Sequence, residues 1–90
     1  MPTGFDWDAA NEEHILKRRE AAPHEAEEAM TDPERLGFDV HDRGKKGIMG
    51  RTEEGRLLLV VYAVRNGKYH VITARDLTET EKHIFRRRSR

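Results

Sequence analysis

Arginine side chains are the groups in this sequence best suited to chemistry on a phosphate. Arg75 directly follows the apolar run Val71-Ile72-Thr73-Ala74, and Arg51 and Arg56 lie on either side of the turn residues Glu53-Glu54-Gly55. A guanidinium group binds phosphate through two parallel hydrogen bonds, and it stabilises the negative charge that develops during phosphodiester cleavage. Arg75, Arg51 and Arg56 are therefore candidate catalytic residues, and Arg75 is the first choice because it lies where a predicted strand ends.

Phosphodiester cleavage also needs a group that accepts a proton, and Glu81 is the candidate. It could act as this base or could orient an arginine. It also has a structural explanation, because Thr78-Glu79-Thr80-Glu81 matches a helix capping box. The arginines have structural alternatives as well: Arg75 could pair with a helix carboxylate, and Arg51 and Arg56 could be solvated charges of the turn.

Basic residues at two predicted helix ends are candidates for RNA binding. Lys17 and Arg18 lie in the last turn of the first helix, and Arg86 and Arg87 belong to the basic run at the end of the sequence. Cations at such positions bind nucleic acid in a salt-dependent way. Lys17 and Arg18 could equally complement the helix dipole, and the final run could be a disordered end or a docking surface for an acidic partner.

Composition narrows the classes of protein that fit. The chain has 90 residues, of which 36% are hydrophobic and 38% are charged, so we expect one domain over residues 1–90 with a thin core. There is no cysteine, and the five histidines show no metal-binding spacing, so we expect no metal and no cofactor. The longest apolar run is too short to span a membrane and no signal peptide is visible, which predicts a cytoplasmic protein without membrane contact.

Charge is distributed unevenly along the chain. Residues 1–40 hold eleven acidic and four basic side chains, whereas residues 41–90 hold six acidic and thirteen basic ones. Such asymmetry is typical of a protein with a face that binds a polyanion. The alternative is that the two halves neutralise each other within the fold.

Apolar periodicity and turn signals predict an α+β fold with two N-terminal helices, a four-stranded antiparallel meander sheet and a C-terminal helix. Asn66-Gly67 between two apolar runs predicts a two-residue type I′ hairpin turn. The last helix is expected to bury Ile84 and Phe85, and all helices to lie on one side of the sheet. The expected helices cover residues 9–19, 23–30 and 79–87, and the expected strands cover residues 36–42, 47–52, 56–65 and 68–75.

The hairpin register follows from counting outward from the turn. It predicts the pairs Tyr62 with Val71, Val60 with Thr73, and Leu58 with Arg75. Both faces of this hairpin are largely apolar, and three short helices cannot cover both. An uncovered apolar face marks a partner site, so we expect a complex with another chain, either a second copy or a different protein.

The sequence resembles the BrnT family of toxins from bacterial type II toxin–antitoxin modules. The resemblance runs from Phe5 to about Phe85, and it rests on the order and spacing of several segments. These are Phe5-Asp6-Trp7-Asp8, Asn11-Glu12-Glu13-His14-Ile15, Pro23-His24-Glu25-Ala26-Glu27-Glu28-Ala29, Asp32-Pro33, Gly50-Arg51-Thr52-Glu53-Glu54-Gly55-Arg56, Val71-Ile72-Thr73-Ala74-Arg75, and Thr78 with Glu81.

The resemblance implies a RelE-like fold and a ribonuclease that arrests translation and is neutralised by a cognate BrnA-type antitoxin. It also implies a phosphate-stabilising role for Arg75, and it aligns Lys17 and Arg18 with a basic pair of the family. The family usually has Lys or Arg, then His-Gly-Val, after the first helix, and here Arg18 takes the position of the His. This departure leaves a second hypothesis open, a catalytically degenerate module of the same fold that binds RNA or a partner. A dimer built through the apolar hairpin face is a third.

Overall fold

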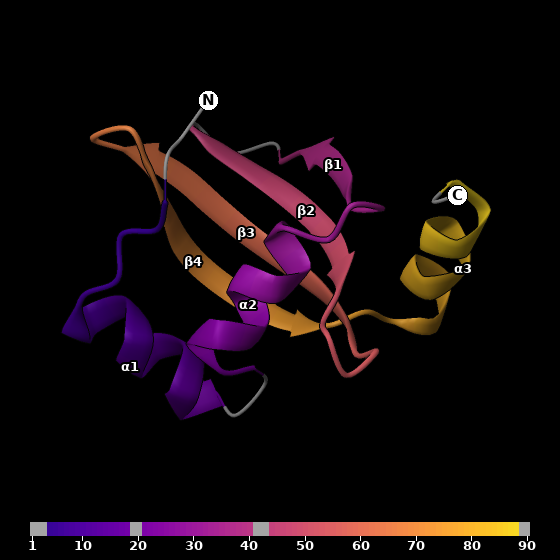
Figure 1. Cartoon of the computed structure of the whole chain (residues 1–90), viewed down its shortest axis with the longest axis horizontal. Helices are drawn as coiled ribbons and strands as arrows, with labels where there is room; N and C mark the ends of the chain where they lie inside the picture. The colour runs from indigo at the N-terminus through magenta and orange to yellow at the C-terminus, as the bar shows by residue number, and fades with distance from the viewer. Residues whose placement is uncertain (1–3, 19–20, 41–43, 89–90) are drawn as a thin grey trace.

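A computed structural model of the chain describes residues 4–18, 21–40 and 44–88, with the side chains of residues 14–18 left undescribed. The predicted order of helices and strands is confirmed, and the four strands form an antiparallel sheet in the order β1-β2-β3-β4 (Figure 1). The predicted ends at residues 19 and 42 fall outside the described residues. The elements are α1 (Ala9–Arg18), α2 (Pro23–Met30), β1 (Leu36–Asp39), β2 (Lys45–Arg51), β3 (Leu57–Arg65), β4 (Lys68–Asp76) and α3 (Glu79–Arg88).

Local hydrogen bonds explain where the first and last helices begin. The Asp8 carboxylate accepts a hydrogen bond of 2.9 Å from the backbone N–H of Asn11, and the Asn11 side-chain oxygen accepts one of 2.7 Å from the N–H of Asp8. The predicted capping box of α3 is confirmed, because Thr78 Oγ1 accepts from the N–H of Glu81 and Glu81 Oε1 accepts from the N–H of Thr78. Each pair satisfies backbone donors that a helix start leaves without partners.

The N-terminal segment closes the outer edge of β4. Phe5 forms a parallel bridge with Tyr69, and the N–H of Asp6 donates to the carbonyl of Tyr69 at 2.7 Å. Further along the same edge, the amide of Asn11 donates to the carbonyl of Val71. A strand edge with unpaired backbone groups would otherwise be open to pairing with another chain.

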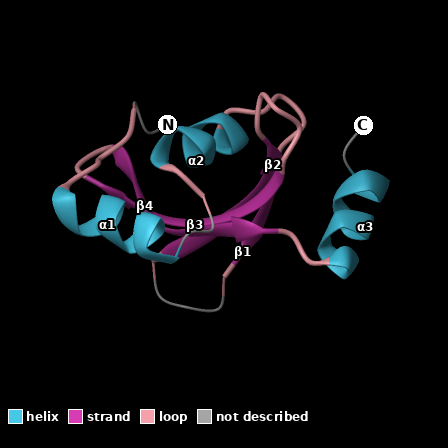
Figure 2. Cartoon of the chain, turned by 90° about the horizontal axis from the view of Figure 1, so that it is seen from below, coloured by secondary structure: helices cyan, strands magenta, loops and turns pink. Residues whose placement is uncertain are grey.

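The helices α1 and α2 cover one face of the sheet. Figure 2 shows α2 over the curved sheet and α1 beside β4. The core between α2 and the sheet is made mainly of small and branched side chains. Gly50 allows α2 to approach β2, because a Cβ atom at this position would clash with the Ala29 carbonyl oxygen. The buried members of this core are Ala21, Ala26, Ala29, Met30, Ile48, Leu58, Val60, Val71 and Ala74.

The helix α3 packs against the opposite face, so the expectation that all helices lie on one side is wrong. Phe85 is 1% exposed and packs with Met49, Leu57, Leu59 and Leu77. These side chains alternate along β2 and β3 with those that face α2, so they belong to the other surface of the sheet. The expectation for Ile84 is also wrong: it is 38% exposed, because α3 contacts the sheet along a narrow stripe.

A β-bulge changes the register of the hairpin. The turn is as predicted, with positive φ at both Asn66 and Gly67, and Tyr62 pairs with Val71. Ile72 then has no partner on β3, so Thr73 pairs with Val61 and Arg75 pairs with Leu59. The predicted pairs of Thr73 with Val60 and Arg75 with Leu58 are therefore wrong. Because successive residues of a strand face opposite ways, this single extra residue places Arg75 on the α3 side of the sheet.

Candidate phosphate-binding site

Arg75 is held by a carboxylate from α3. Its two terminal nitrogens each lie 2.8 Å from a different oxygen of Glu81, in the side-by-side geometry of a two-point ion pair. One of these nitrogens also donates to the carbonyl of Asp76 at 3.0 Å. The side chain of Arg75 is 36% exposed and that of Glu81 is 20% exposed. The guanidinium is thus fixed in orientation at the border of the sheet while part of it faces solvent.

The ion pair makes Glu81 a positioning group. Hydrogen bonds from Arg75, and from the backbone and hydroxyl of Thr78, lower the pKa of Glu81 to about 2, although its burial opposes this shift. A carboxylate with so low a pKa is a weak base at neutral pH. Of the two roles that the sequence left open for Glu81, the geometry favours the orientation of Arg75.

This pKa predicts a specific acid sensitivity. Because the pKa of Glu81 in the folded state lies below its ordinary value of 4.5, the ion pair contributes full stability above that value and loses its contribution as the pH falls from 4.5 to about 2. We expect Glu81→Gln to be less stable than the unsubstituted chain at neutral pH, and the difference to shrink across this range. Urea unfolding at a series of pH values measures it, and a difference independent of pH would contradict the assignment.

Arg51 lies on the same face of the sheet as Arg75. It pairs with Leu57, and Arg75 pairs with Leu59, so both side chains project from the face of the sheet that α3 covers. Its guanidinium carbon lies 5.8 Å from the centre of the Phe85 ring, within the range of a cation–π contact. A carboxylate oxygen of Glu34 lies 3.9 Å from a terminal nitrogen of Arg51, and the side chain of Arg51 is 46% exposed. Arg51 and Arg75 therefore lie beside the area of the sheet on which α3 packs.

Arg56 does not join them. Its guanidinium binds both carboxylate oxygens of Asp76, at 2.8 and 3.2 Å, and one oxygen of Glu25 at 3.0 Å. Glu25 belongs to α2, and Asp76 pairs with Leu58, so this network lies on the α2 side. The hydrogen bonds that Arg56 donates to Asp76 raise the pKa of Arg56, and the bond from the Ala22 N–H lowers the pKa of Glu25. The structure separates Arg56 from the other two arginines and ties it to the packing of α2.

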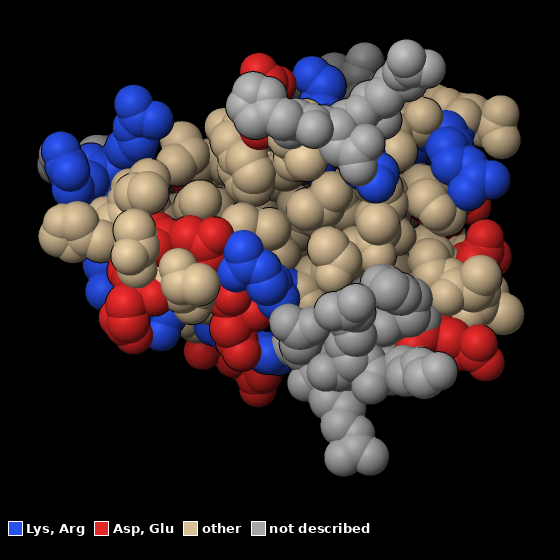
Figure 3. Space-filling model, turned by 180° about the vertical axis from the view of Figure 1, so that it is seen from behind, with Lys and Arg blue, Asp and Glu red and all other residues tan. Residues whose placement is uncertain are grey.

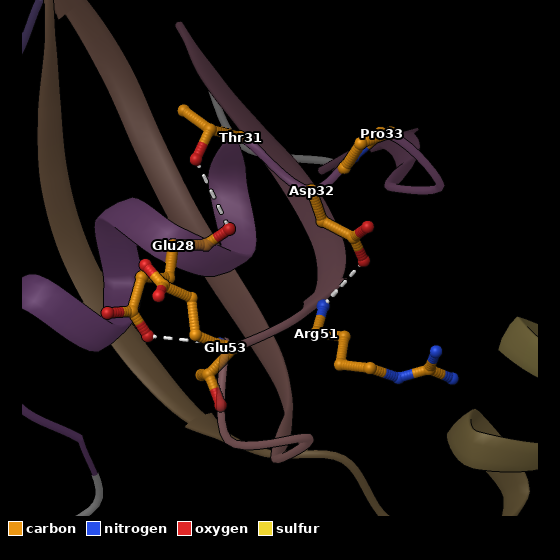
Figure 4. A pocket seen from close by; sticks show the side chains of 7 residues that line it. Glu28, Thr31, Asp32, Pro33, Arg51 and Glu53 are labelled. Carbon is orange, nitrogen blue, oxygen red and sulfur yellow. Dashed lines mark hydrogen bonds between the residues drawn. The ribbon is translucent and has the colours of Figure 1, made fainter.

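A hollow of about 270 Å³ lies beside Arg51, but its lining is acidic (Figure 4). Asp32 accepts a hydrogen bond from the backbone N–H of Arg51, and Glu28 accepts one from that of Glu53. The side chain of Arg51 points away from these carboxylates toward α3 (Figure 4). These two hydrogen bonds hold the β2–β3 turn against α2 and the residues that follow it. The carboxylates would repel a phosphate, so this hollow is not a phosphate site.

The other predicted RNA-binding residues are only partly described. Arg86 and Arg87 are exposed on α3, whereas the side chains of Lys17 and Arg18 lie outside the described residues. Figure 3 shows the face opposite α2, where uncharged side chains fill the centre and basic side chains lie at several margins, including the end formed by α3. By strand register, the basic residues of this face are Lys45, Arg51, Arg65, Lys68, His70 and Arg75. We call this surface the open face.

A family model described as the ribonuclease toxin BrnT of type II toxin–antitoxin systems matches residues 7–81. The chain belongs to the BrnT family. The match includes all four strands, Arg75 and Glu81, and the resemblance seen in the sequence is thereby confirmed. No individually curated protein matches the sequence. Membership in the BrnT family implies an RNA substrate and an antitoxin partner.

Among the side chains that the structure describes (residues 4–13, 21–40 and 44–88), no three of His, Asp or Glu are grouped so that they could hold a metal ion. In the same part of the chain, no helix has the length and apolar character needed to cross a membrane.

One group of side chains was missed by reasoning from the sequence. His70 lies between Asp6 and Arg65, with Nδ1 at 3.5 Å from an Asp6 oxygen and a terminal nitrogen of Arg65 at 3.2 Å from Nε2. The contact between Arg65 and His70 could have been predicted from the hairpin register, because the two residues are diagonal neighbours on adjacent strands. The contribution of Asp6 could not be found this way, because the N-terminal segment meets β4 only in the folded chain.

Proposed function

We propose that this BrnT protein is a cytoplasmic toxin that cleaves RNA without a metal, arrests translation and is neutralised by a BrnA-like antitoxin. The observation that carries the proposal is Arg75, oriented by two hydrogen bonds to Glu81 at the border of the open face. We further propose that residues 1–90 form one domain and that its fold is RelE-like.

The proposed role of Arg75 is to bind phosphate. A fixed guanidinium stabilises charge on a phosphate without having to reorganise during the reaction. Arg51, on the other side of Phe85, and the exposed Arg86 and Arg87 add positive charge at the same end of the molecule. RNA bound across the open face would therefore meet cations from both β2 and α3.

The proposed partner is an antitoxin segment that is acidic and amphipathic. Val61, Ala63 and Thr73 lie half-buried in the centre of the open face, and the face is bordered by basic residues. An apolar centre with a basic border complements a segment of this kind. Bound there, the antitoxin would occupy the surface that we assign to RNA.

The test is RNA cleavage by the purified chain, free of antitoxin and with a chelator present. We expect single-stranded RNA to be cut, growth to stop when the chain is expressed, and incorporation of labelled amino acids to fall. Growth should resume when the antitoxin is expressed with it. Intact RNA under all conditions tested would refute the enzymatic part of the proposal.

The second candidate is a BrnT protein that binds RNA or its partner without cleaving RNA. Two observations favour it: Arg18 stands where the family usually has His, and the low pKa of Glu81 makes this residue a poor base. Binding of RNA that weakens with salt and yields no cleavage products would distinguish this candidate.

A further inference from the structure

The cluster of Asp6, His70 and Arg65 has the arrangement of a proton-transfer centre. Asp6 lies in the N-terminal segment that runs along β4 (Figure 1), and its carboxylate approaches Nδ1 of His70. A proton on Nδ1 directed at Asp6 leaves Nε2 as the nitrogen that accepts a proton. A terminal nitrogen of Arg65 lies 3.4 Å from Nδ1 and 3.2 Å from Nε2, so in this tautomer the guanidinium donates to Nε2, and it must turn to a phosphate before Nε2 can accept a proton. An imidazole thus has a carboxylate on one side, at ion-pair distance, and a cation beside it.

The cluster opens onto a hollow of about 280 Å³ between β4 and the start of α1. Arg65, His70 and the bulged residue Ile72 all line it. Asp8, which also lines the hollow, is engaged at the start of α1, where its carboxylate accepts a hydrogen bond from the N–H of Asn11. Bulges occur often beside active sites because they redirect side chains, and this one brings Arg75 onto the face of the sheet from which His70 projects. The side chain of His70 is 16% exposed, so it is held in place yet reachable from the hollow.

We propose that His70 is the general base of RNA cleavage in this chain and that Arg65 binds the phosphate that is cut. This inference rests on the proposed ribonuclease function and supplies the base that Glu81 cannot be. Nε2 takes the proton of a ribose 2′-hydroxyl, and the 2′-oxygen bonds to phosphorus as the bond from phosphorus to the 5′-oxygen breaks. The leaving 5′-oxygen takes a proton from water, and the imidazolium returns its proton to the hydroxide that remains. The products are a 2′,3′-cyclic phosphate and a free 5′-hydroxyl.

This assignment gives Arg75 a different phosphate to bind. His70 and Arg75 are five residues apart on β4, a distance of about 16 Å at 3.3 Å per residue. One phosphate cannot contact both side chains. A single strand of RNA lying along β4 would place the cut phosphate at Arg65 and His70 and a later one at Arg75.

The test compares His70→Ala with His83→Ala, which removes an exposed histidine from α3. Cleavage of a mixed-sequence single-stranded RNA is measured for each purified chain, and binding is measured with the same RNA carrying 2′-O-methyl groups, which cannot react. We expect His70→Ala to cleave about 100-fold more slowly, with unchanged binding, and added imidazole to restore part of the rate. The control is expected to cleave like the unsubstituted chain.

The outcomes separate the two proposals. Suppose that the unsubstituted chain cuts RNA. If His70→Ala cuts it equally fast, or if its binding falls as much as its cleavage rate and added imidazole restores no activity, the proposed role of His70 is wrong, and the ribonuclease proposal still stands. If the unsubstituted chain cuts no RNA, both fail. Should His70→Ala not fold, Asp6→Asn decides: a rate about tenfold lower with unchanged binding supports the centre, and an unchanged rate overturns it.

Discussion

Replacing Arg75 with alanine is expected to abolish growth arrest and to slow cleavage of dilute RNA by about 10- to 100-fold, because it removes a charge-assisted contact to a bound phosphate. The substitution removes the guanidinium that Glu81 holds at the border of the open face. It also leaves the Glu81 carboxylate without this partner, so some loss of stability is expected as well. Colony formation on induction and the cleavage rate of the purified chain measure the effect.

The matched control for Arg75 is Arg88→Ala. It removes the same charge from an exposed position of α3 and breaks no ion pair with Glu81. We expect Arg88→Ala to weaken RNA binding slightly at low salt and to leave growth arrest intact. An equal loss in both variants would mean that total positive charge is what matters, and the specific role of Arg75 would be abandoned. Unfolding curves of both variants separate loss of activity from loss of fold.

Phe85→Ala is expected to cost about 3 kcal/mol of stability, at the lower end for a fully buried phenylalanine. Phe85 is 1% exposed and is the buried contact of α3 with Met49, Leu57 and Leu59. In a chain of this size such a loss lowers the melting temperature by roughly 12 to 24 °C. Since α3 also carries Glu81, the orientation of Arg75 depends on the same side chain.

The neighbouring substitution Ile84→Ala is the control for Phe85. Ile84 is 38% exposed, so removing its side chain leaves no cavity, and we expect a change below about 1 kcal/mol. Thermal and urea unfolding of both variants give the comparison. Equal losses would mean that α3 does not rest on the sheet through Phe85.

The parts of the fold that the sequence predicted correctly are those that short-range interactions determine. The positive φ angles of Asn66 and Gly67 and the capping box of Thr78 and Glu81 each depend on residues within a few positions of one another. Turn chemistry and helix caps act over one turn of chain, so the residue types are enough to identify them. The order of the helices and strands follows from these signals and from apolar periodicity.

The bulge at Ile72 shows where such reasoning ends. Nothing in the types of residues 71–75 indicates that one of them lacks a partner, because the bulge results from how β3 and β4 twist while both faces pack. Yet it decides which side of the sheet Arg75 occupies, because an extra residue exchanges the two faces for the rest of the strand.

The sequence by itself determined that this chain has an α+β meander with helices at both ends, an arginine-rich second half and the motifs of the BrnT family. Only the tertiary structure decided which charged groups lie together and on which face of the sheet. Arg56 pairs with Asp76 and Glu25, which are 20 and 31 residues away, and His70 contacts Asp6 near the start of the chain. Contacts between distant residues depend on strand register and on the face that each helix covers, and these are fixed only when the whole core packs together.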